Sequence, residues 1–580
     1  MIQTLAVRSP MAVHETDVLV IGGGLAALRA ALSARQAGAR VLVAVKRKLG
    51  QSGSSANTSG GFAAACPDLN PADDAWQHYA DSVVGGGFVN ERRLTRAVAD
   101  EAPARLRDLW EVGARFQQRN GRYHLSPSGD HRQPRVLVPE HIRGTDLTLP
   151  LRAAVSAAGV EALENTLIVE LLVDDGRVIG AVGIRRDRVD ACVIRAGATI
   201  LAAGGAGRLF SVTSNPVDVT GGGYALAIRA GAPLRDMEFI QFYPWRLIRP
   251  FGSSRVPVQP STFVSGAKLY NRRGERFMEA YDPVRKEAST RDVSARAIFD
   301  QIRFGLDVDG GVVLDLSDVP DAQFRLENSK VTERLDPRGI DYRAIPLILA
   351  PEAHFVMGGV SIDESGGSAL PGLYACGESA GGVHGGNRLN SNAVPETQVF
   401  GHRAGRAAAA FAVRPRGGRV DDDVLAAWVA RLKEVRSDAS DVSPELKDAL
   451  AAFRQAMWLG LGIVRTAEGL ERARAQAAAM RDRVAGLPQE TLGALIGAVE
   501  LEQLAAVGTA CAASALLRTE SRAAHYRDDF PRTDPSWVAT VVYEGGEARR
   551  RPLAVDPDED RRLAPAPASA PVARPDEFVE

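Results

Sequence analysis

A strand, a glycine-rich turn and a helix near the N-terminus constrain the fold of this chain most. Residues 16–21 form a run of β-branched and apolar residues that is typical of a short buried strand. The pattern Gly22-x-Gly24-x-x-Ala27 follows, and an Ala- and Leu-rich helix is predicted over 25–36. Residues 41–45 predict the next strand. Together these segments predict a βαβ unit that opens a parallel sheet.

The glycine turn between this strand and helix is suited to a pyrophosphate. The free amides and the dipole of the helix N-terminus attract anions, Gly24 permits a close approach and Ala27 permits tight helix–strand packing. An ordinary tight turn is the alternative. No acidic residue lies between Asp17 and Asp68, so the usual ribose carboxylate is missing. Lys46 follows the second strand, and the ribose has to be held in another way.

Small hydroxyl residues and glycines crowd the segment 50–61, which precedes the apolar residues 62–65. The segment is either a solvated loop or a wrap of hydroxyl and backbone donors around a polar cofactor, and we favour the wrap. A second glycine-rich turn spans 202–207. A third segment, 377–389, joins glycines to Glu378, His384 and Arg388. Glycines let a backbone approach a planar ligand, and a guanidinium fork suits a carboxylate.

The bulk composition narrows the class of protein. The chain has 580 residues, is 45% hydrophobic and 24% charged, and has a net charge of −1. These values predict a soluble multi-domain protein with no nucleic-acid partner. We find no long apolar run that predicts a transmembrane segment. The four cysteines are far apart, which fits reduced thiols in the cytoplasm and excludes an iron–sulfur cluster built by this chain alone. No metal site is predicted.

The pattern along the chain predicts an α/β fold with three parts. A Rossmann-like dinucleotide-binding domain is discontinuous, with its first part at 11–240 and its second at 346–415. An inserted α+β cap domain occupies 241–345, where prolines and irregular spacing increase. A helical domain spans 421–520, and Ser443-Pro444-Glu445 is a good helix start within it. A C-terminal extension covers 521–551, and we expect the Pro- and Ala-rich tail 552–580 to be disordered.

Several ordered motifs together carry a resemblance to one family. They are the Gly22 turn, 54–61, 202–207, 237–239, 274–278, 291–293, 354–359, 377–388 and 521–525. On these motifs the chain resembles the succinate dehydrogenase and fumarate reductase flavoproteins, and it is closest in style to the soluble L-aspartate oxidases. The resemblance runs from about residue 16 to about 537. It implies FAD, a cap over the flavin and a helical domain behind it.

The resemblance assigns roles to matching residues. Arg291 would relay a proton to or from a substrate carbon, while His354 and Arg388 would bind a substrate carboxylate. A surface arginine and a structural histidine are the alternatives. Glu378 would hold hydroxyls of the cofactor, and His384 could serve either packing or chemistry. The expected FAD-binding residues are Gly22, Gly24, Leu25, Ala26, Lys46, Ser52, Ser54, Ser55, Thr58, Gly60, Gly61, Ala203, Gly204, Glu378, Asn392 and Ala393.

Four positions depart from the family pattern. Ser54 stands where membrane-complex members carry a flavin-linking histidine, so we expect non-covalent FAD. Tyr243 replaces a substrate-binding histidine and is included among the catalytic candidates. The Thr-Glu pair of the family falls near Gln259, where this chain has none. Gly222 stands where an aspartate is usual. Trp245 and Arg246 could line an altered pocket or sit in the cap core.

These features predict an FAD-dependent oxidoreductase of the aspartate oxidase or fumarate reductase type. Its substrate would be a small carboxylic or amino acid, with oxygen, fumarate, quinone or a partner protein as the electron acceptor. One alternative is a flavoprotein subunit that depends on a partner for electrons. Another is a flavin-binding protein without catalysis. An oligomer is possible under each hypothesis.

Overall fold

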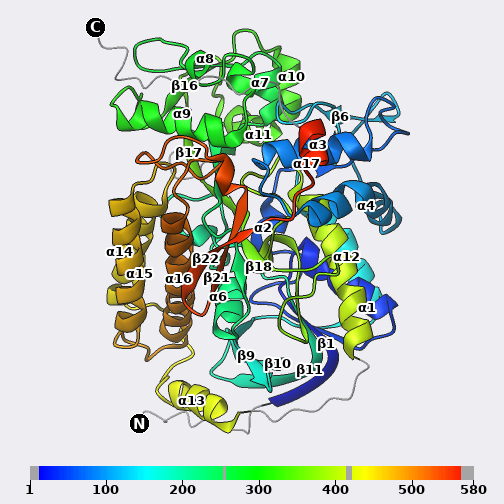
Figure 1. Cartoon of the computed structure of the whole chain (residues 1–580), viewed down its shortest axis with the longest axis vertical. Coiled ribbons are helices and arrows are strands. Elements are labelled where there is room, and N and C mark those ends of the chain that lie inside the picture. Colours follow the sequence, from blue (N-terminus) through cyan, green and yellow to red (C-terminus); the bar gives the residue numbers. More distant parts are fainter. Residues whose placement is uncertain (1–11, 252–255, 413–420, 564–580) are drawn as a thin grey trace.

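A mixed sheet forms the base of the structure, a computed structural model that describes residues 12–251, 256–412 and 421–563 (Figure 1). Its strand order is β8-β2-β1-β11-β10-β9, and β19 pairs in parallel with β11. Strands β8, β2, β1 and β11 run parallel, whereas β10 and β9 are antiparallel additions. The bounds are β1 Ala12–Ile21, β2 Val41–Ala44, β8 Glu161–Leu163, β9 Thr166–Asp174, β10 Arg177–Arg185, β11 Ala191–Leu201 and β19 Leu373–Ala375.

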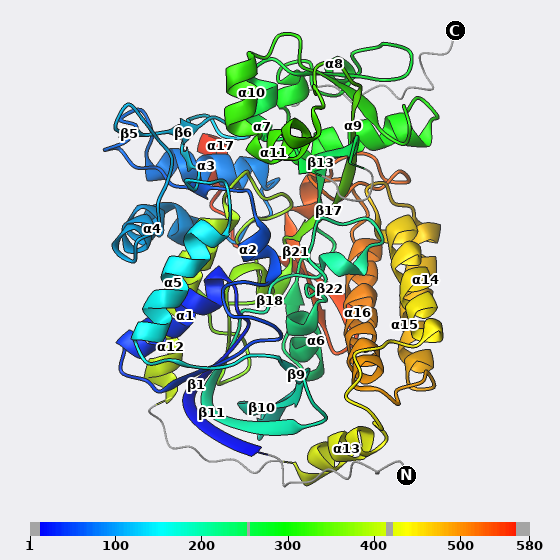
Figure 2. The ribbon, with the colours of Figure 1, turned by 180° about the vertical axis from the view of Figure 1, so that it is seen from behind.

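Alanine-rich helices cover one side of this sheet. Helix α1 (Leu25–Gln36) packs against α12 (Ala393–Ala412), and α4 (Arg92–Glu111) and α5 (Thr145–Ala157) flank them (Figure 2). Small side chains allow this close approach, because a Cβ at Gly405 of α12 would lie 2.4 Å from the Ala30 carbonyl oxygen of α1. Strand β19 and helix α12 follow the cap in sequence, so the FAD-binding fold is discontinuous as predicted.

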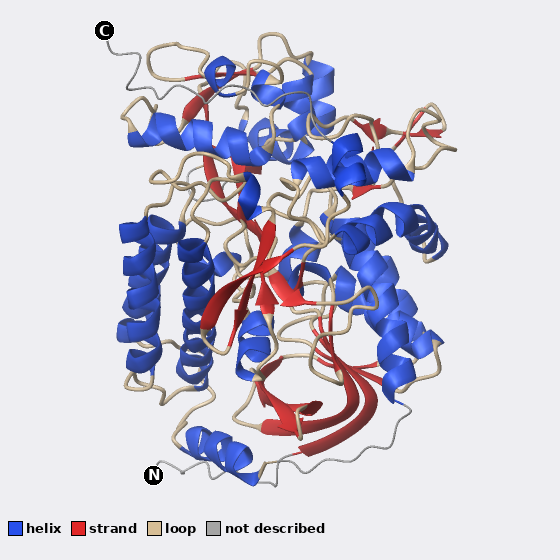
Figure 3. Cartoon of the chain, viewed as in Figure 1, coloured by secondary structure: helices blue, strands red, loops and turns tan. Residues whose placement is uncertain are grey.

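The cap contains its own sheet, of order β14-β13-β17-β16-β15. Strand β17 (Leu347–Val356) belongs to this sheet but lies wholly after residue 345, so the cap continues beyond its predicted end. The cap strands and helices are β13 Ile240–Arg249, β14 Val256–Pro257, α7 Pro260–Val264, β15 Lys268–Tyr270, α8 Met278–Tyr281, α9 Arg291–Arg303, β16 Val312–Asp315, α10 Asp321–Glu327 and α11 Ser329–Leu335. Figure 3 shows this part above the large sheet.

Helices α14 (Pro444–Leu461), α15 (Ala467–Val484) and α16 (Leu492–Leu517) stand on the opposite side of the molecule from α1 and α12 (Figures 1 and 2). Ser443 caps α14 by accepting a hydrogen bond from the Leu446 amide at 3.2 Å. Among the described residues, helix α16 alone is long and apolar enough to cross a membrane by length and composition. It packs against α15, α14 and α6 (Gly222–Arg229), so its apolar surface lies in the protein core. Helix α13 (Asp422–Lys433) precedes the three.

The C-terminal segment is more ordered than predicted. Strands β21 (Ala539–Glu544) and β22 (Glu547–Pro552) complete a sheet with β12 (Leu234–Arg235), β18 (Gly359–Ser361) and β20 (Ala380–Gly381). Helix α17 (Pro557–Leu563) follows, so the expectation of disorder from 552 was wrong as far as residue 563. Buried Leu563 packs with Tyr79 and Val83, which stabilises this end despite its charged composition. The rest of the predicted tail lies outside the described residues.

The remaining short elements connect the larger parts. They are α2 Gly53–Asn57, β3 Phe62–Ala63, α3 Ala75–Gly85, β4 Gln118–Arg119, β5 Arg122–Tyr123, β6 Leu125–Ser126, β7 Val136–Leu137, and the 3-10 turns Gly207–Leu209, Lys286–Ala288, Asp336–Arg338, Gly377–Ser379 and Pro535–Trp537. Helix α2 carries the hydroxyl-rich segment, and the turn at Gly377–Ser379 carries Glu378. These two elements bring the predicted glycine-rich segments to one cavity.

Candidate active site

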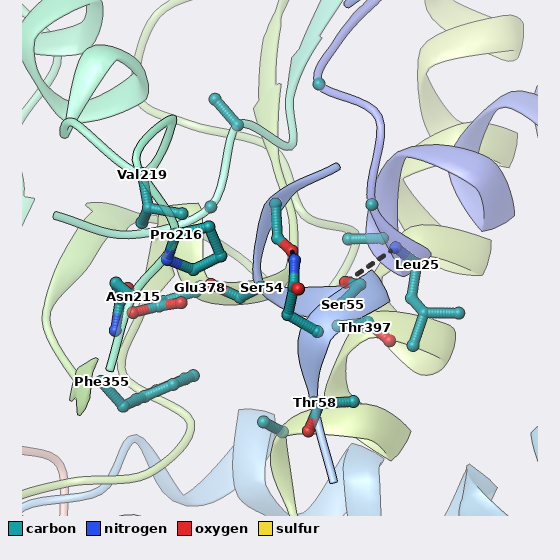
Figure 4. Close-up of a pocket in the computed structure, with 18 of the residues that line it drawn as sticks. Leu25, Ser54, Ser55, Thr58, Asn215, Pro216, Val219, Phe355, Glu378 and Thr397 are labelled. Carbon is teal, nitrogen blue, oxygen red and sulfur yellow. Dashed lines mark hydrogen bonds between the residues drawn. The ribbon is translucent and has the colours of Figure 1, made fainter. Parts of the chain in front are cut away.

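One elongated cavity runs from the β1–α1 turn to the cap. Its walls come from the Gly22 turn, helix α2, the turn at 202–204, the loop 214–223 and the segment 376–397. The cap closes one end with residues of β13 and β17. Figure 4 shows Ser54, Ser55 and Thr58 facing the loop that carries Asn215 and Val219 across this space. Three segments that are far apart in the sequence therefore meet at one cavity.

The β1–α1 turn needs glycine for steric reasons. Gly22 has φ +133°, and a Cβ there would lie 2.1 Å from the Ala202 carbonyl oxygen. Gly24 is the N-cap residue of α1, and a Cβ there would lie 2.8 Å from the Ser55 hydroxyl. A side chain at either position would fill the turn. The turn therefore brings the backbone and the positive end of α1 against the cavity, as a pyrophosphate requires.

The hydroxyl-rich segment wraps the cavity rather than lying in solvent. The Leu25 amide donates to the Ser55 hydroxyl at 3.1 Å, which joins α2 to the start of α1 (Figure 4). The Gly61 amide donates to Ser391 at 3.1 Å, and a Cβ at Gly61 would lie 2.3 Å from the Leu137 carbonyl oxygen. Ser54 lines the cavity and is half-buried. The wrap interpretation therefore agrees with the structure.

Lys46 is held in place by groups from two other segments, the loop 214–223 and helix α16. Its Nζ donates to Thr220 Oγ1 at 2.7 Å and to the Asp218 carbonyl at 2.9 Å, and it forms an ion pair with Glu500 at 3.1 Å. Lys46, Asp218 and Thr220 line the cavity. At the end of β2, other dinucleotide-binding folds usually have one acidic side chain. In this chain the cluster around Lys46 takes that position. Glu500 of α16 was not predicted to contribute.

Glu378 places a carboxyl group at the cavity wall. Burial raises the pKa of Glu378 to about 8, while the Val356 amide, which donates to it at 3.0 Å, acts in the opposite direction. A Cβ at Gly205 would lie 2.0 Å from the same carboxyl group, so a side chain at 205 would displace the carboxyl of Glu378. A carboxyl with a pKa near neutrality can donate or accept a hydrogen bond, which suits the hydroxyls of a cofactor chain.

The cavity accommodates most of the predicted cofactor-binding residues. Among the described residues, those that line it are Gly22, Gly24, Leu25, Ala26, Lys46, Ser52, Ser54, Ser55, Thr58, Gly60, Gly61, Ala203, Gly204, Glu378 and Ala393. Asn392 does not line it, because its side chain bonds His78 and Ser82 of α3, both at 2.9 Å. The glycine turn, the hydroxyl wrap and the carboxyl group fit the pyrophosphate, hydroxyls and planar ring of FAD.

Two buried guanidiniums meet beside the cap. Arg291, the first residue of α9, donates to Gln241 Oε1 at 3.0 Å, and Arg388 donates to the same oxygen at 2.8 Å. Arg291 also donates to Asn390 Oδ1 at 2.7 Å. No carboxylate among the described residues forms an ion pair with either arginine. Burial, and then Arg291, lower the pKa of Arg388 to about 9, while burial lowers the pKa of Arg291. This end of the cavity is therefore suited to an anion.

His354 lies beside the two arginines as a neutral imidazole. Burial, followed by the charges of Arg388 and Arg291, lowers the pKa of His354 well below its usual value. Its Nδ1 lies 2.9 Å from the Ser214 hydroxyl, and its carbonyl accepts a hydrogen bond from Asn215 at 2.8 Å. When Ser214 donates to Nδ1, Nε2 carries the proton and can donate into the cavity.

Tyr243 lines the cavity but its hydroxyl proton is already used. The hydroxyl donates to the Val258 carbonyl at 2.6 Å. The Arg291 guanidinium lies 4.9 Å from the centroid of the tyrosine ring, and the His354 ring lies 5.2 Å from it. A carboxylate only accepts hydrogen bonds, so Tyr243 cannot bind one as the histidine of the family does. Its ring instead orients Arg291 and His354.

Sequence reasoning missed several wall residues and left others open. Asn215, Phe355 and Asn390 line the cavity. Phe355 follows His354 and Asn390 lies close to Arg388 in the sequence, which is the signal that could have indicated them, whereas Asn215 lies outside the motifs. Arg246 lines the cavity, whereas Trp245 stacks on Phe263 in the cap core at 4.6 Å. Of the two alternatives for this pair, lining the pocket holds for Arg246 and packing in the cap core holds for Trp245.

The two remaining uncertain positions are not equivalent. His384 is buried with its Nε2 2.9 Å from Glu396, and it does not line the cavity. The geometry therefore favours a packing role for His384 over a chemical one. Gly222 begins α6 and lines the cavity, and a Cβ there would lie 3.0 Å from Gln503 Oε1. Gln503 is thus the polar side chain that faces the position where the family usually has aspartate.

Comparison with protein families gives two consecutive matches. The FAD binding domain matches residues 17–394, and the fumarate reductase flavoprotein C-terminal domain matches residues 451–567. The described residues cover the first region apart from 252–255, and the second as far as residue 563. The residues 17–394 cover both parts of the glycine-rich cavity and the cap inserted between them.

Individual relatives match almost end to end. A subunit of the fumarate reductase (CoM/CoB) of Methanothermobacter marburgensis is 39% identical over 535 residues, which are 91% of this chain and 97% of that protein. L-aspartate oxidase of Caulobacter vibrioides is 36% identical over 537 residues, 90% of this chain and 95% of that protein. The structure of Mycobacterium smegmatis Sdh1 in complex with UQ1 has a TM-score of 0.82 at 30% identity, covering 94% of this chain and 95% of that one.

Proposed function

The chain belongs to the succinate dehydrogenase and fumarate reductase flavoprotein family, and we propose that it is the flavoprotein subunit of a fumarate reductase-type enzyme. It would interconvert a small dicarboxylic acid and its unsaturated counterpart, and exchange electrons with a partner protein. The observation that carries the proposal is the pair of buried guanidiniums, Arg291 and Arg388, held on one oxygen of Gln241 with His354 alongside.

The proposed roles follow from the charge and position of each side chain. Arg388 and the Nε2 of His354 bind and polarise a substrate carboxylate, which stabilises negative charge as it develops there. Arg291 delivers or removes the proton at the substrate carbon. Burial supports that role because it lowers the pKa of Arg291, which makes the guanidinium a better acid. When bound, FAD supplies the hydride chemistry.

The dependence on a partner is the alternative raised by the sequence analysis, and the comparisons support it better than the main prediction, which left the electron acceptor open. A relative at 39% identity over most of both chains is named as one subunit of a fumarate reductase, which supports the alternative of a multisubunit enzyme. The cysteine pattern is consistent with this, because an iron–sulfur relay would have to come from another chain. An L-aspartate oxidase remains a second candidate function, supported by relatives at 36% identity.

A direct experiment separates these functions. The flavin of the purified protein is reduced with dithionite, excess reductant is removed, and fumarate is added anaerobically. We expect the oxidised flavin absorbance to return with fumarate and to return slowly with oxygen. L-aspartate added to the oxidised protein, with oxygen consumption recorded, tests the second candidate. Absence of any absorbance response to fumarate, succinate and aspartate would contradict both.

We also propose that FAD binds without a covalent link. Ser54 lines the cavity at the position assigned to the flavin-linking histidine of other members, and a serine hydroxyl cannot form that histidyl bond. Acid precipitation of the holoprotein should therefore leave a colourless pellet and a yellow supernatant. A yellow pellet would overturn this proposal. We place the protein in the cytoplasm because its widely spaced cysteines fit a reducing compartment.

A further inference from the structure

Each reduction of a substrate double bond removes one proton from Arg291 in the proposed function, so that proton has to be replaced. We propose that Asp130 replaces it, with protons drawn from a second cavity that lies behind the candidate active site. This inference rests on the proposed function, because it supplies the proton that Arg291 delivers. It follows from the position of the two cavities, from a hydrogen-bond partner that both residues share, and from the charges at the wall between the cavities.

The second cavity has a volume of about 660 Å³ and shares a wall with the first. At two places the chain alternates between them. Arg291 lines the first cavity, while its neighbours on both sides line the second. In the same way, Leu389 lines the second cavity, while its neighbours on both sides line the first. The wall between the candidate active site and the second cavity is therefore only one residue thick at these places.

The second cavity reaches the molecular surface and is polar. The exposed residues Arg132, Arg285 and Arg562 line it, and so do the carboxyl groups of Asp130 and Asp292. A cavity that is roomy and has several polar groups in its wall holds water. Protons can therefore reach the back of the candidate active site from solvent while the cap closes the substrate end.

Asp130 lies at this wall and shares a partner with Arg291. Its Oδ2 accepts a hydrogen bond from the Asn390 amide at 2.6 Å, and the side-chain oxygen of Asn390 accepts one from Arg291 at 2.7 Å. The Ser128 hydroxyl donates to the other oxygen of Asp130. The two side chains, both within the described part of the chain, do not bond each other. One water molecule of the second cavity carries the proton between them in this proposal.

The charges at the wall favour transfer in this direction. Burial lowers the pKa of Arg291, while Tyr243 and Asp130 oppose that effect. Burial raises the pKa of Asp130, but His131, Arg291 and two hydrogen bonds outweigh it and bring the pKa below its usual value. Once Arg291 has released its proton, its effect on the carboxylate is lost, and Asp130 becomes a stronger base. Asp130 then takes a proton from cavity water and passes it on, so that its O–H bond breaks and an N–H bond of Arg291 forms.

The test separates the first turnover from those that follow. Prereduced holoprotein is mixed anaerobically with fumarate in a stopped-flow instrument, which records one turnover as flavin reoxidation. Steady-state fumarate reduction is then measured with reduced methyl viologen as the electron donor. For Asp130→Asn we expect a first turnover close to that of the wild type, because Arg291 starts with its proton. Steady-state turnover should fall about 10²-fold, because each later turnover waits for a new proton.

Asp292→Asn is the matched control. Asp292 lines the same cavity next to Arg291, but it accepts a hydrogen bond from Asn387 at 3.0 Å and does not bond Asn390. This variant should keep both rates. The anion site is checked with malonate, which is titrated into each oxidised holoprotein while the flavin absorbance is recorded. Asp130→Asn should bind malonate at least as tightly as the wild type, because a negative charge that acts on Arg388 is removed.

A second variant distinguishes proton supply from a merely structural role. Asp130→Glu keeps a carboxyl group at the wall, so its steady-state turnover should exceed that of Asp130→Asn at equal flavin content. Wild-type steady-state turnover in Asp130→Asn, an equal loss in its first turnover, or an equal loss in Asp292→Asn would overturn this inference alone. Loss of flavin from both Asp130 variants would also overturn it. If fumarate does not reoxidise the wild-type flavin, the proposed function is wrong as well.

Discussion

At the scale of single residues, the site is defined by which proton each side chain has available. Arg291 and Arg388 share the oxygen of Gln241, and their mutual repulsion and burial lower the pKa of Arg388 to about 9. His354 is neutral. The donors that remain are therefore two buried guanidiniums and one imidazole N–H, and in the proposed function they bind a substrate carboxylate.

Arg291 carries the proposed proton transfer, and its loss should affect turnover more than binding. For Arg291→Gln we expect the rate of fumarate reduction to fall about 10²- to 10⁴-fold, the usual contribution of a positioned acid. The malonate dissociation constant should change less than tenfold, because Arg388 and His354 remain. Stopped-flow reoxidation of the reduced flavin measures the rate. Arg273→Gln, at an exposed cap position, is the control. Retention of wild-type turnover in Arg291→Gln would exclude the relay.

The lowered pKa of Arg388 predicts an alkaline limit for anion binding. Below about pH 9 the guanidinium is charged and binds the carboxylate; above that value it loses its proton, so the malonate dissociation constant should rise about tenfold per pH unit. Malonate itself stays ionised over this range. Since the charge of Arg291 lowers this pKa, Arg291→Gln should move the limit to higher pH. Flavin-absorbance titrations from pH 7 to 10.5 test this, and a flat profile in the wild type would contradict it.

The residue types at this site could be read from the sequence, but their bonding could not. The resemblance to the family predicted that Arg291, His354 and Arg388 share one site, and all three line one cavity. The hydrogen bond of the Tyr243 hydroxyl to the Val258 carbonyl joins residues 15 apart in the sequence, and only the folding of the cap brings them together. Asn392 was misassigned for the same reason: its neighbours on both sides line the cavity, while its own side chain turns toward α3.

At the scale of elements, the β1–α1 turn carries a steric requirement that a paired substitution can isolate. Gly22 and Gly38 both have positive φ, +133° and +92°, but only Gly22 has a backbone oxygen, that of Ala202, where a Cβ would go. Gly38→Ala should cost only the backbone strain, about 1 kcal/mol. Gly22→Ala should also displace the turn, so the ratio of FAD to protein should fall sharply. Flavin absorbance against protein concentration measures this. Full FAD content in Gly22→Ala would contradict this steric requirement.

Periodicity predicted the long elements well and the irregular ones poorly. Helix α1 matches its predicted range, 25–36, and the start of α14 at Ser443 was read correctly, because both have local caps and composition. The bulge in β13 has no such local signature beyond Pro244. Its effect, to turn Arg246 toward the cavity, depends on how β13 pairs with β17.

At the scale of the whole molecule, a buried charge network joins three parts of the chain. Arg518, at the end of α16, forms ion pairs with Glu238 at 2.7 Å and with Glu520 at 2.9 Å, and all three side chains are fully buried. Arg518 also donates to the carbonyls of Trp537 and Ala539, which precede or begin β21. The C-terminal extension is therefore connected to the helical domain and to the base of the cap.

Removal of Arg518 should destabilise the protein as a whole. Burial raises the pKa of Glu238 to about 7, and Arg518 opposes that rise, so the variant Arg518→Met leaves the Glu238 carboxyl group buried without its cation, while Glu520 keeps its ion pair with Arg522. The expected loss is about 3–5 kcal/mol, seen as a lower melting temperature of the holoprotein. Arg549→Met, at an exposed residue paired with Glu547, should change it little. Equal melting temperatures for the two variants would contradict this network's contribution.

The order of domains was predictable at this scale, but the course of the C-terminus was not. The strand-like, irregular and helical sequence patterns differ enough to distinguish the large sheet, the cap and the helical domain. The segment after 552 is charged and Pro-rich, so composition alone indicated disorder. Contacts that are remote in sequence stabilise it up to 563, including the ion pair of Asp560 with Arg92 at 2.8 Å.

Strands β13 and β17 both build the cap and carry side chains of the candidate site. Arg246, Glu352 and His354 stand on these strands and Arg291 begins a cap helix, whereas Arg388 belongs to the base. The charged side chains of the candidate site therefore come from two parts of the chain, the cap and the base. Arg388 of the base bonds Gln241 of the cap, and Lys330 of the cap bonds Ser59 of the base at 2.6 Å. If the cap moves as a unit to admit an acid, Arg291 and His354 move away from Arg388, and the site is complete only when the cap returns to the described position.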